Sequence, residues 1–140
     1  MDNAKVKIKT KHFGVLSGYA LSVGNPHVIF FKDITFELLK KIGPQIEHHE
    51  FFPERCNVTF AKIMNKQNIA VKVWERGAGL TKACGTAACA TAFAAKQNGL
   101  TNNKVDVEFS TGKLSISIDQ NNSIHMKGPV SDIENIEIKI

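Results

Sequence analysis

The alanine-rich run from Thr86 to Asn98 constrains the fold more than any other part of this 140-residue sequence. Alanine, cysteine and phenylalanine occur on every side of the helix that this run predicts, whereas an exposed helix keeps one polar face. We therefore predict a helix that is buried all round and that ends at Gly99. A chain of this length can bury such a helix only if the rest of the chain wraps around it.

Short runs of alternating polar and apolar residues, typical of strands, flank this helix on both sides. Because their order suggests antiparallel neighbours and no β–α–β unit, we predict an α+β domain. In it, a mixed, mostly antiparallel sheet rolls around one central alanine-rich helix. A shorter helix is predicted over residues 33–43, capped by Asp33 or Thr35 and ended by Gly43-Pro44. The strands are predicted at residues 5–10, 18–23, 27–31, 57–64, 68–77, 104–110, 113–119, 123–128 and 135–140.

The length and composition are those of a single domain, residues 1–140, with a core of its own. No run approaches the roughly 20 apolar residues that cross a bilayer. No signal peptide is expected, because the opening MDNAKVKIKT has no apolar stretch after its charges. We therefore expect a cytoplasmic protein without a membrane partner.

The net charge of +5 comes from scattered lysines, without a basic run that has interleaved aromatic residues. No nucleic-acid partner is expected from this pattern. A modest positive field suits a small anionic substrate equally well.

Three cysteines, Cys56, Cys84 and Cys89, occur without a Cys-x-x-Cys pair. The odd count and the spacing indicate reduced thiols and argue against a disulfide framework or a structural zinc site. No metal site is expected at residues 48–50 (His-His-Glu), because adjacent side chains in a strand or loop point apart. Cys89 is predicted to lie in the core, and Cys56 to be structural.

Cys84 and Gly85 stand at the start of the alanine-rich helix, where backbone N–H groups have no intrahelical partner. These groups carry partial positive charge, so the thiol should ionise more easily than a free cysteine, whose pKa is about 8.5. The N–H groups of Gly85 and Thr86 can also hold a substrate carboxylate. A thiolate beside such a clamp suits abstraction of a proton α to a carboxylate. Alternatively, Cys84 is a small loop residue and Gly85-Thr86 only starts a helix.

Further polar residues lie at the ends of predicted strands. Arg76 can pair with a second carboxylate and Glu75 can accept from a substrate ammonium, or both are solvated charges at a strand end. His27 can tune the thiol or hold a proton, whereas Asn25 beside it can equally be a turn residue. Asn57 is either a turn cap or a ligand.

Five stretches, in this order, resemble the C-terminal half of the diaminopimelate epimerase family. They are GNPHVIFF, GPQIEHHEFFPERCNVTF, WERGAG, ACGTAACA and GPVSDIENIEI, and the resemblance runs from about Gly18 to the last residue. It implies isomerisation of LL-diaminopimelate to the meso form, for lysine and peptidoglycan biosynthesis, without pyridoxal phosphate, another cofactor or a metal. It also implies two similar domains, each supplying one cysteine from the mouth of its central helix, so that the two cysteines flank the α-carbon as thiolate base and thiol acid.

The resemblance also implies roles for individual residues. Cys84 corresponds to the cysteine of the C-terminal domain. Glu75 and His27 correspond to polar groups beside the reacting centre, which makes them candidate catalytic residues with Cys84. The substrate-binding candidates are Gly85 and Thr86 at the reacting carboxylate, Asn25, Asn57 and Arg76 at the distal end, and Glu75.

The sequence departs from the family in three respects. The N-terminal domain, with its cysteine in an Asn-Gly-x-Arg-Cys setting, is absent from these 140 residues. Leu80 stands where the family usually has Glu and is expected to loosen polar contacts of the loop, whereas Ala87 in place of Gly is a mild change that favours the helix. We therefore expect the isolated chain to be inactive, to need the missing domain as partner, and to self-associate through the face that it leaves uncovered.

Two other functions fit parts of the pattern. One is half of a related proline- or hydroxyproline-type racemase. The presence of Arg76, Asn25 and Asn57 argues against it, because these residues suit a substrate with a second charged end. The other is a non-catalytic binding module on the same fold, and the presence of Cys84, Glu75 and Arg76 argues against it.

Overall fold

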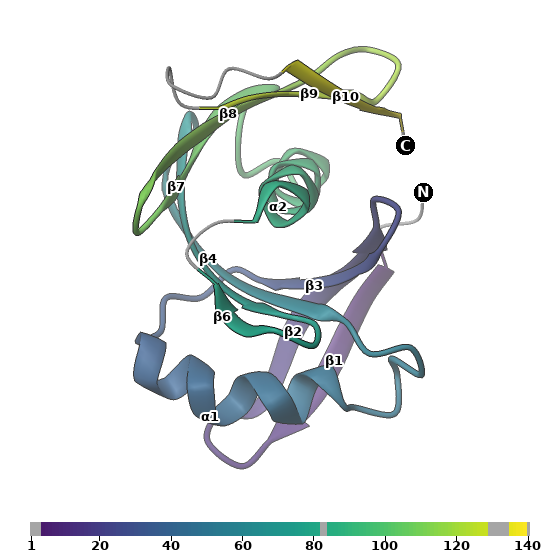
Figure 1. Cartoon of the computed structure of the whole chain (residues 1–140), viewed down its shortest axis with the longest axis vertical. Coiled ribbons are helices and arrows are strands. Elements are labelled where there is room, and N and C mark those ends of the chain that lie inside the picture. The colour runs from purple at the N-terminus through teal and green to yellow at the C-terminus, as the bar shows by residue number, and fades with distance from the viewer. Residues whose placement is uncertain (1–3, 82–83, 129–134, 140) are drawn as a thin grey trace.

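A computed structural model of the chain describes residues 4–81, 84–128 and 135–139. A ten-stranded sheet curls around helix α2 (Gly85–Gln97), and helix α1 (Phe36–Glu47) lies outside the curl (Figure 1). The strand order is β1-β2-β3-β4-β5-β7-β8-β9-β10, with β6 paired to β5 off this path. The strands are β1 (Ala4–Thr10), β2 (Gly14–Ser22), β3 (Pro26–Phe30), β4 (Asn57–Asn65), β5 (Asn68–Glu75), β6 (Gly79–Thr81), β7 (Lys104–Phe109), β8 (Gly112–Ile118), β9 (Ser123–Lys127) and β10 (Asn135–Lys139).

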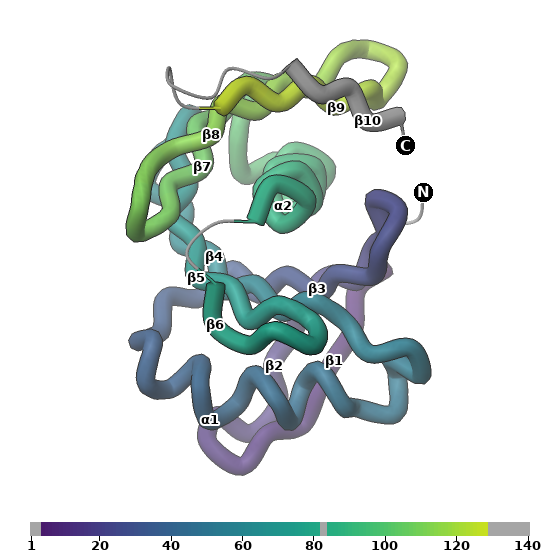
Figure 2. Tube along the Cα trace, in the orientation of Figure 1, coloured from purple at the N-terminus to yellow at the C-terminus, as the bar shows by residue number. Residues whose placement is uncertain are grey.

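Two strand pairs are parallel, β3 with β4 and β5 with β7, and the other pairs are antiparallel. The predicted mixed, mostly antiparallel sheet is therefore confirmed. The exclusion of β–α–β units is wrong, because α1 carries the chain from β3 back to the start of β4 and α2 carries it from β6 to β7 (Figure 2). Parallel neighbours need such a crossover, and the sequence patterns did not reveal which strands are neighbours.

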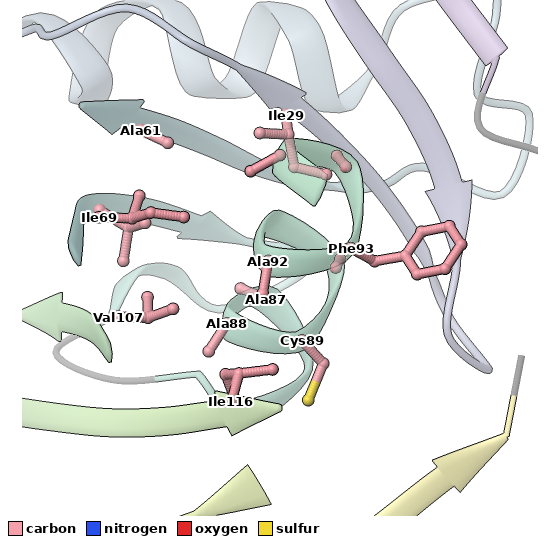
Figure 3. Packing of buried hydrophobic residues seen from close by; sticks show 14 of the residues in the cluster. Ile29, Ala61, Ile69, Ala87, Ala88, Cys89, Ala92, Phe93, Val107 and Ile116 are labelled. Atoms are coloured by element: carbon pink, nitrogen blue, oxygen red, sulfur yellow. The ribbon is translucent and has the colours of Figure 1, made fainter. Parts of the chain in front are cut away.

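The prediction that α2 is buried all round is confirmed. Every residue from Ala87 to Ala95 is buried, and the helix packs against side chains of β3, β4, β5, β7, β8 and β9 (Figure 3). Small side chains allow this, because strands can approach an alanine helix closely on all sides. Gly99, with a φ of 70°, follows the C-cap as predicted.

A second core lies on the outer face of β3 and β4, under α1. Strand residues alternate between the two cores: Ile29 and Ala61 face α2, whereas Val28 and Phe60 belong to the cluster that packs against α1. A strand that is buried on both faces explains the unbroken apolar run at residues 28–31.

Helix α1 runs four residues beyond its predicted end. Thr35 caps it, its hydroxyl accepting from the Leu38 N–H at 3.1 Å, as one of the two predicted caps. Gly43-Pro44 does not end the helix, so that prediction is wrong. Gly43 is kept inside the helix by packing, because the Trp74 indole occupies the space where a side chain would begin.

Neither α1 nor α2, the helices of the described part of the chain, has the length and apolar character of a membrane-crossing helix.

We predict that Gly43→Ala destabilises the fold. A Cβ at this position would lie 2.6 Å from Cγ of Trp74, so the helix or the indole must shift, at a cost of about 1–3 kcal/mol. This cost opposes the gain in helix propensity, which is about 1 kcal/mol. Chemical denaturation measures the net effect, with Lys40→Ala on the exposed face as the control. A Gly43→Ala variant that is as stable as the parent, or more so, contradicts the packing argument.

Candidate active site at the mouth of helix α2

The predicted site residues meet because of the sheet topology. Parallel pairing places His27, in β3, beside Asn57, in β4, so the starts of both strands lie at the same edge. Strand β5 runs antiparallel to β4 and pairs Trp74 with Val58, so its end at Glu75 lies at that edge too. Polar residues that are distant in the sequence therefore converge at this edge.

Cys84 is joined to His27 by a chain of polar contacts. The thiol lies 3.5 Å from the hydroxyl of Thr86, and that hydroxyl accepts from the side-chain amide of Asn25 at 3.4 Å. The amide oxygen of Asn25 lies 3.2 Å from Nε2 of His27. Cys84, Thr86 and Asn25 are half-buried, whereas His27 is 1% exposed. Four of the predicted residues thus form one connected group.

These contacts assign the tautomer of His27. Because Nδ2 of Asn25 donates to Thr86, Oδ1 faces the histidine and requires a donor, so Nε2 carries the proton. Nδ1 is buried and has no hydrogen-bond partner in the described part of the chain. Burial, with a smaller contribution from the charge of Arg76, lowers the pKa of His27 to about 4. The imidazole is therefore neutral at physiological pH, with a free lone pair on Nδ1.

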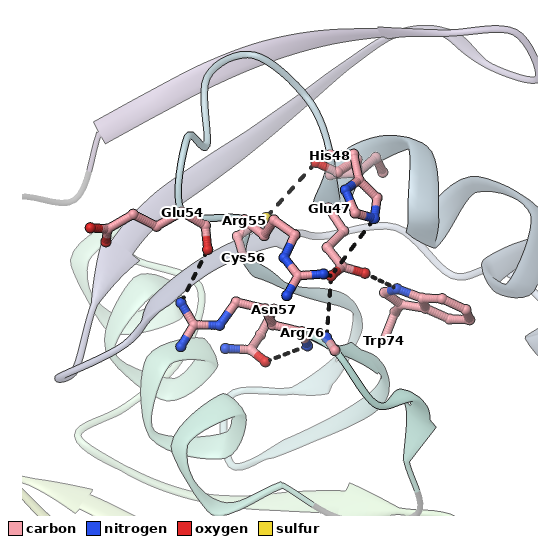
Figure 4. A network of polar contacts seen from close by, with 10 residues as sticks. Glu47, His48, Glu54, Arg55, Cys56, Asn57, Trp74 and Arg76 are labelled. Carbon is pink, nitrogen blue, oxygen red and sulfur yellow. Dashed lines mark hydrogen bonds and ion pairs between the residues drawn. The ribbon is translucent and has the colours of Figure 1, made fainter.

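Asn57 links three segments through its side chain. Its Nδ2 donates to the carbonyl of Pro26 at 3.1 Å. Its Oδ1 accepts from the backbone N–H of Arg76 at 2.8 Å (Figure 4). The side chain is 2% exposed. Asn57 therefore fixes the start of β3 and the loop after β5 relative to each other.

The guanidinium of Arg76 forms no ion pair with a carboxylate of the described residues. Its Nη1 donates to the carbonyl of Glu54 at 3.3 Å, and the side chain is half-buried. Glu75 is half-buried beside it at the end of β5, and its carbonyl accepts from Ala78 N–H at 3.0 Å. The guanidinium can therefore still bind a carboxylate from outside.

The mouth of α2 begins at Cys84, which is its N-cap but whose side chain makes no capping hydrogen bond. The carbonyl of Cys84 accepts from Ala88 N–H at 3.1 Å, which begins the helical hydrogen-bond pattern. The N–H groups of Gly85 and Thr86 come before Ala88, the first donor of this pattern, and have no intrahelical acceptor. A side chain at Gly85 would meet Sδ and Cε of Met126 at 3.1 and 3.0 Å, so glycine at this position lets Met126 pack closely against the start of α2.

The three thiols differ in environment. Cys56 and Cys89 are completely buried, as predicted for Cys89, and burial is the main cause that raises the pKa of each to about 12. Cys84 is half-buried. The described residues include no group of three or more His, Cys, Asp or Glu side chains that could hold a metal ion.

Leu80 and Ala87, where the sequence departs from the family pattern, are both accommodated by packing. Leu80 pairs with Trp74 across β5 and β6 and packs against the core under α1. Ala87 is fully buried in the first turn of α2. The predicted loosening of the loop by Leu80 stays a prediction.

The sequence analysis missed Glu47, a buried carboxylate at the end of α1. It accepts from Nε1 of Trp74 at 2.8 Å and from Gly77 N–H at 3.2 Å, directly after Arg76 (Figure 4). The spacing of Glu47 in the sequence could have indicated its burial. It follows Leu39 and Gly43 at intervals of four residues, which places all three on the buried face of a helix that continues past Pro44.

Several solved structures share this fold. A hydroxyproline epimerase from Agrobacterium vitis, solved with bound trans-4-OH-L-proline, has a TM-score of 0.62 over 96% of this chain and 44% of its own, at 13% identity. A Bacillus anthracis phenazine biosynthesis protein of the PhzF family has a TM-score of 0.57 over 79% of this chain and 38% of its own, at 19% identity. The chain thus has the α+β fold of these proteins.

The sequence identifies the family. A family model described as "Diaminopimelate epimerase" matches residues 19–133. The chain is 65% identical to the diaminopimelate epimerase of Pelagibacter ubique over 132 residues, which are 94% of this chain and 47% of that protein. It is 49% identical to that of Caulobacter vibrioides over 114 residues, 79% of this chain and 40% of the relative. The chain belongs to the diaminopimelate epimerase family and spans less than half the length of these relatives.

We predict that Cys84 alone is alkylated under native conditions. Burial hinders access to Cys56 and Cys89 and disfavours their thiolates, which are the reactive forms. Treatment with iodoacetamide followed by peptide mass spectrometry should find the label on Cys84 only, and Cys84→Ser should abolish labelling. The denatured chain, in which all three sites react, is the control. Comparable labelling of Cys89 in the native chain contradicts this assignment.

We predict that His27 stays neutral until the pH approaches 4. The unfolded chain binds this proton near pH 6.5, so the residue reduces stability as the pH falls from about 6.5 to about 4. Proton NMR of the Cε1–H resonance measures the midpoint, and His27→Gln identifies the signal. A midpoint near 6.5 would show that the ring is not desolvated in the folded chain.

Proposed function

We propose that this chain supplies one half of the active site of a diaminopimelate epimerase, in which Cys84 exchanges the α-proton of the substrate. The observation that carries the proposal is the position of Cys84 at the mouth of α2, half-buried and 3.5 Å from Thr86, while the other two thiols are completely buried. Family membership supports the reaction, and this geometry supports the role of the thiol.

In the proposed step, the Cys84 thiolate takes the α-proton and becomes a thiol. The electron pair of the broken C–H bond moves toward the substrate carboxylate, whose growing charge meets the N–H groups of Gly85 and Thr86. A second thiol on the other face of the carbon donates a proton, which inverts the configuration. The roles reverse in the opposite direction. We expect neither pyridoxal phosphate nor a metal to take part, and the product would feed lysine and peptidoglycan synthesis.

His27 and Glu75 complete the reacting end in this proposal. The neutral imidazole holds Asn25, which in turn holds Thr86 beside the thiol. We propose that Glu75, which is half-buried beside Arg76, accepts from the substrate ammonium.

The distal end of diaminopimelate is a second amino acid group, which requires its own partners. Arg76 is the expected partner of the distal carboxylate, because its guanidinium has no ion pair in the described part of the chain. Asn57 holds the backbone of Arg76 and has one N–H left, and Asn25 completes the set. A substrate without a distal charge would leave this arginine unpaired.

The second thiol must come from outside these 140 residues. Cys56 and Cys89 are buried, with pKa values raised to about 12, and neither can donate or accept a proton at an open site. We therefore propose that residues 1–140 act as one domain, with a second domain that brings the other cysteine, and that the chain alone does not catalyse inversion. The coverage of 47% of the Pelagibacter relative is consistent with such a partner.

Exposed apolar side chains beside the site support a contact surface for that domain or for a second copy of the chain. Phe51 is 53% exposed and lines a pocket with Pro26, Pro53 and Arg55. Such a surface is expected to be covered in the working protein.

A proline- or hydroxyproline-type racemase half is the alternative, favoured by the fold of the hydroxyproline epimerase. The uncompensated Arg76 favours the substrate with two carboxylates. Protection of Cys84 from alkylation distinguishes the two, because diaminopimelate should protect and proline should not. A non-catalytic module would show neither protection nor a thiol more reactive than a free cysteine.

We predict that inversion of diaminopimelate, with deuterium incorporated at the α-carbon in heavy water, appears only when the chain is combined with the part of the Pelagibacter relative that lies outside the match. One thiol can remove a proton, but inversion needs a donor on the other face. Mass spectrometry follows deuterium incorporation, and chromatography separates the stereoisomers. Cys84→Ser should lower the rate of inversion by at least about a thousandfold.

Cys89→Ser is the matched control, because it changes a buried thiol in the same helix and should leave exchange within about twofold. A complex that forms but does not exchange, or a Cys84→Ser variant that remains active, contradicts the proposed role.

A further inference from the structure

Glu47 is the buried carboxylate that the proposed chemistry does not use. Its side chain is 5% exposed and receives donors on both oxygens. Oε1 accepts from Nε1 of Trp74 at 2.8 Å, and Oε2 accepts from Gly77 N–H at 3.2 Å. Oε2 also lies 3.4 Å from Nη1 of Arg55. Because an ionised carboxylate only accepts hydrogen bonds, it suits this position, where Trp74, Gly77 and Arg55 all present donors.

The two contacts on either side of Arg76 clamp the loop that carries it. The N–H of Arg76 donates to Asn57, and the next N–H, of Gly77, donates to Glu47. Gly77 has a φ of 77°, so the loop turns sharply here in a conformation that favours glycine. With two successive amides held by two buried side chains, the direction in which the Arg76 side chain leaves the backbone is fixed.

Glu47 acts on the guanidinium of Arg76 from the other side as well. Its ion pair with Arg55 holds the segment whose carbonyl, at Glu54, accepts from Nη1 of Arg76 at 3.3 Å. Arg55 has a φ of 64°, an unfavourable conformation for a residue with a side chain, and the ion pair helps to maintain it. The same carboxylate also engages one of the two arginines in the sequence, so that the other stays unpaired.

We infer that Glu47 is a positioning residue for substrate recognition, which holds Arg76 ready for the distal carboxylate of diaminopimelate. This inference rests on the proposed function, in which Arg76 binds that carboxylate. Without Glu47 the loop that carries Arg76 would populate other conformations. The apparent affinity for diaminopimelate would then fall in proportion to the fraction of molecules whose loop is in the binding conformation. The effect should be confined to ligands that reach Arg76.

Glu47→Gln tests this with almost no change in shape. A glutamine must turn its NH2 group toward either Trp74 or Gly77, and both of these are donors, so one pairing becomes donor against donor. We expect the affinity of the chain for diaminopimelate, measured by NMR titration, to fall about tenfold. The affinity for alanine, which carries only the carboxylate of the reacting end, should change by less than about twofold.

Trp74→Phe provides a rescue that a merely structural role does not predict. In Glu47→Gln/Trp74→Phe the glutamine oxygen can accept from the N–H of Gly77. Its NH2 group then faces the phenylalanine introduced at position 74, which has no N–H donor to oppose it. We expect this double variant to bind diaminopimelate within about threefold of Trp74→Phe alone. Asp33→Asn, which changes an exposed carboxylate paired with Lys62 and Lys72, is the matched control and should bind as the parent does.

Amide hydrogen exchange at Gly77 gives a readout that does not depend on ligand, and should speed up in Glu47→Gln. Parent-like diaminopimelate binding by Glu47→Gln, or equal losses for diaminopimelate and alanine, overturns the inference and leaves the proposed function intact. A parent chain that binds alanine but not diaminopimelate overturns both the inference and the proposed function. This holds even if amide exchange at Gly77 shows that Glu47 holds the loop.

Discussion

The parallel pairing of β3 with β4 is the constraint on which the rest of the structure depends. Parallel neighbours require the chain to cross over one face of the sheet, and α1 makes that crossing. The crossing buries the outer face, so both strands are buried on both sides. It also brings the starts of the two strands to one edge, where His27 and Asn57 become neighbours. The polar site therefore follows from a backbone arrangement.

Much of this arrangement could be predicted from local patterns. The composition of α2 predicted its burial, because alanine, cysteine and phenylalanine on all sides leave no face for water. Alternation predicted the strands, and the glycine after α2 predicted its end. Motif resemblance brought together Cys84, Thr86, Asn25 and His27, which the structure joins by contacts of 3.2–3.5 Å. Their roles in catalysis remain proposals.

Other features depended on contacts that local patterns do not contain. Gly43-Pro44 normally ends a helix, but α1 continues because the indole of Trp74, 31 residues later, packs against Gly43. Glu47 then falls inside the helix and on its buried face. The pairing of β5 with β7 was missed for the same reason, since parallel neighbours leave no turn between them as a signal. Tertiary packing overrode the local preference in each case.

The small side chains of α2 have a consequence for how this chain can change. Strands approach the helix from several directions at once, so the volume of each residue from Ala87 to Ala95 sets how tightly the sheet can curl. A larger apolar residue there is as hydrophobic as the core requires, yet its volume would push the strands apart and widen the curl of the sheet. Size, more than polarity, therefore limits substitution along α2. Because the same helix carries Cys84 at its mouth, the radius of curvature of the sheet and the position of the thiol are set by the same side chains.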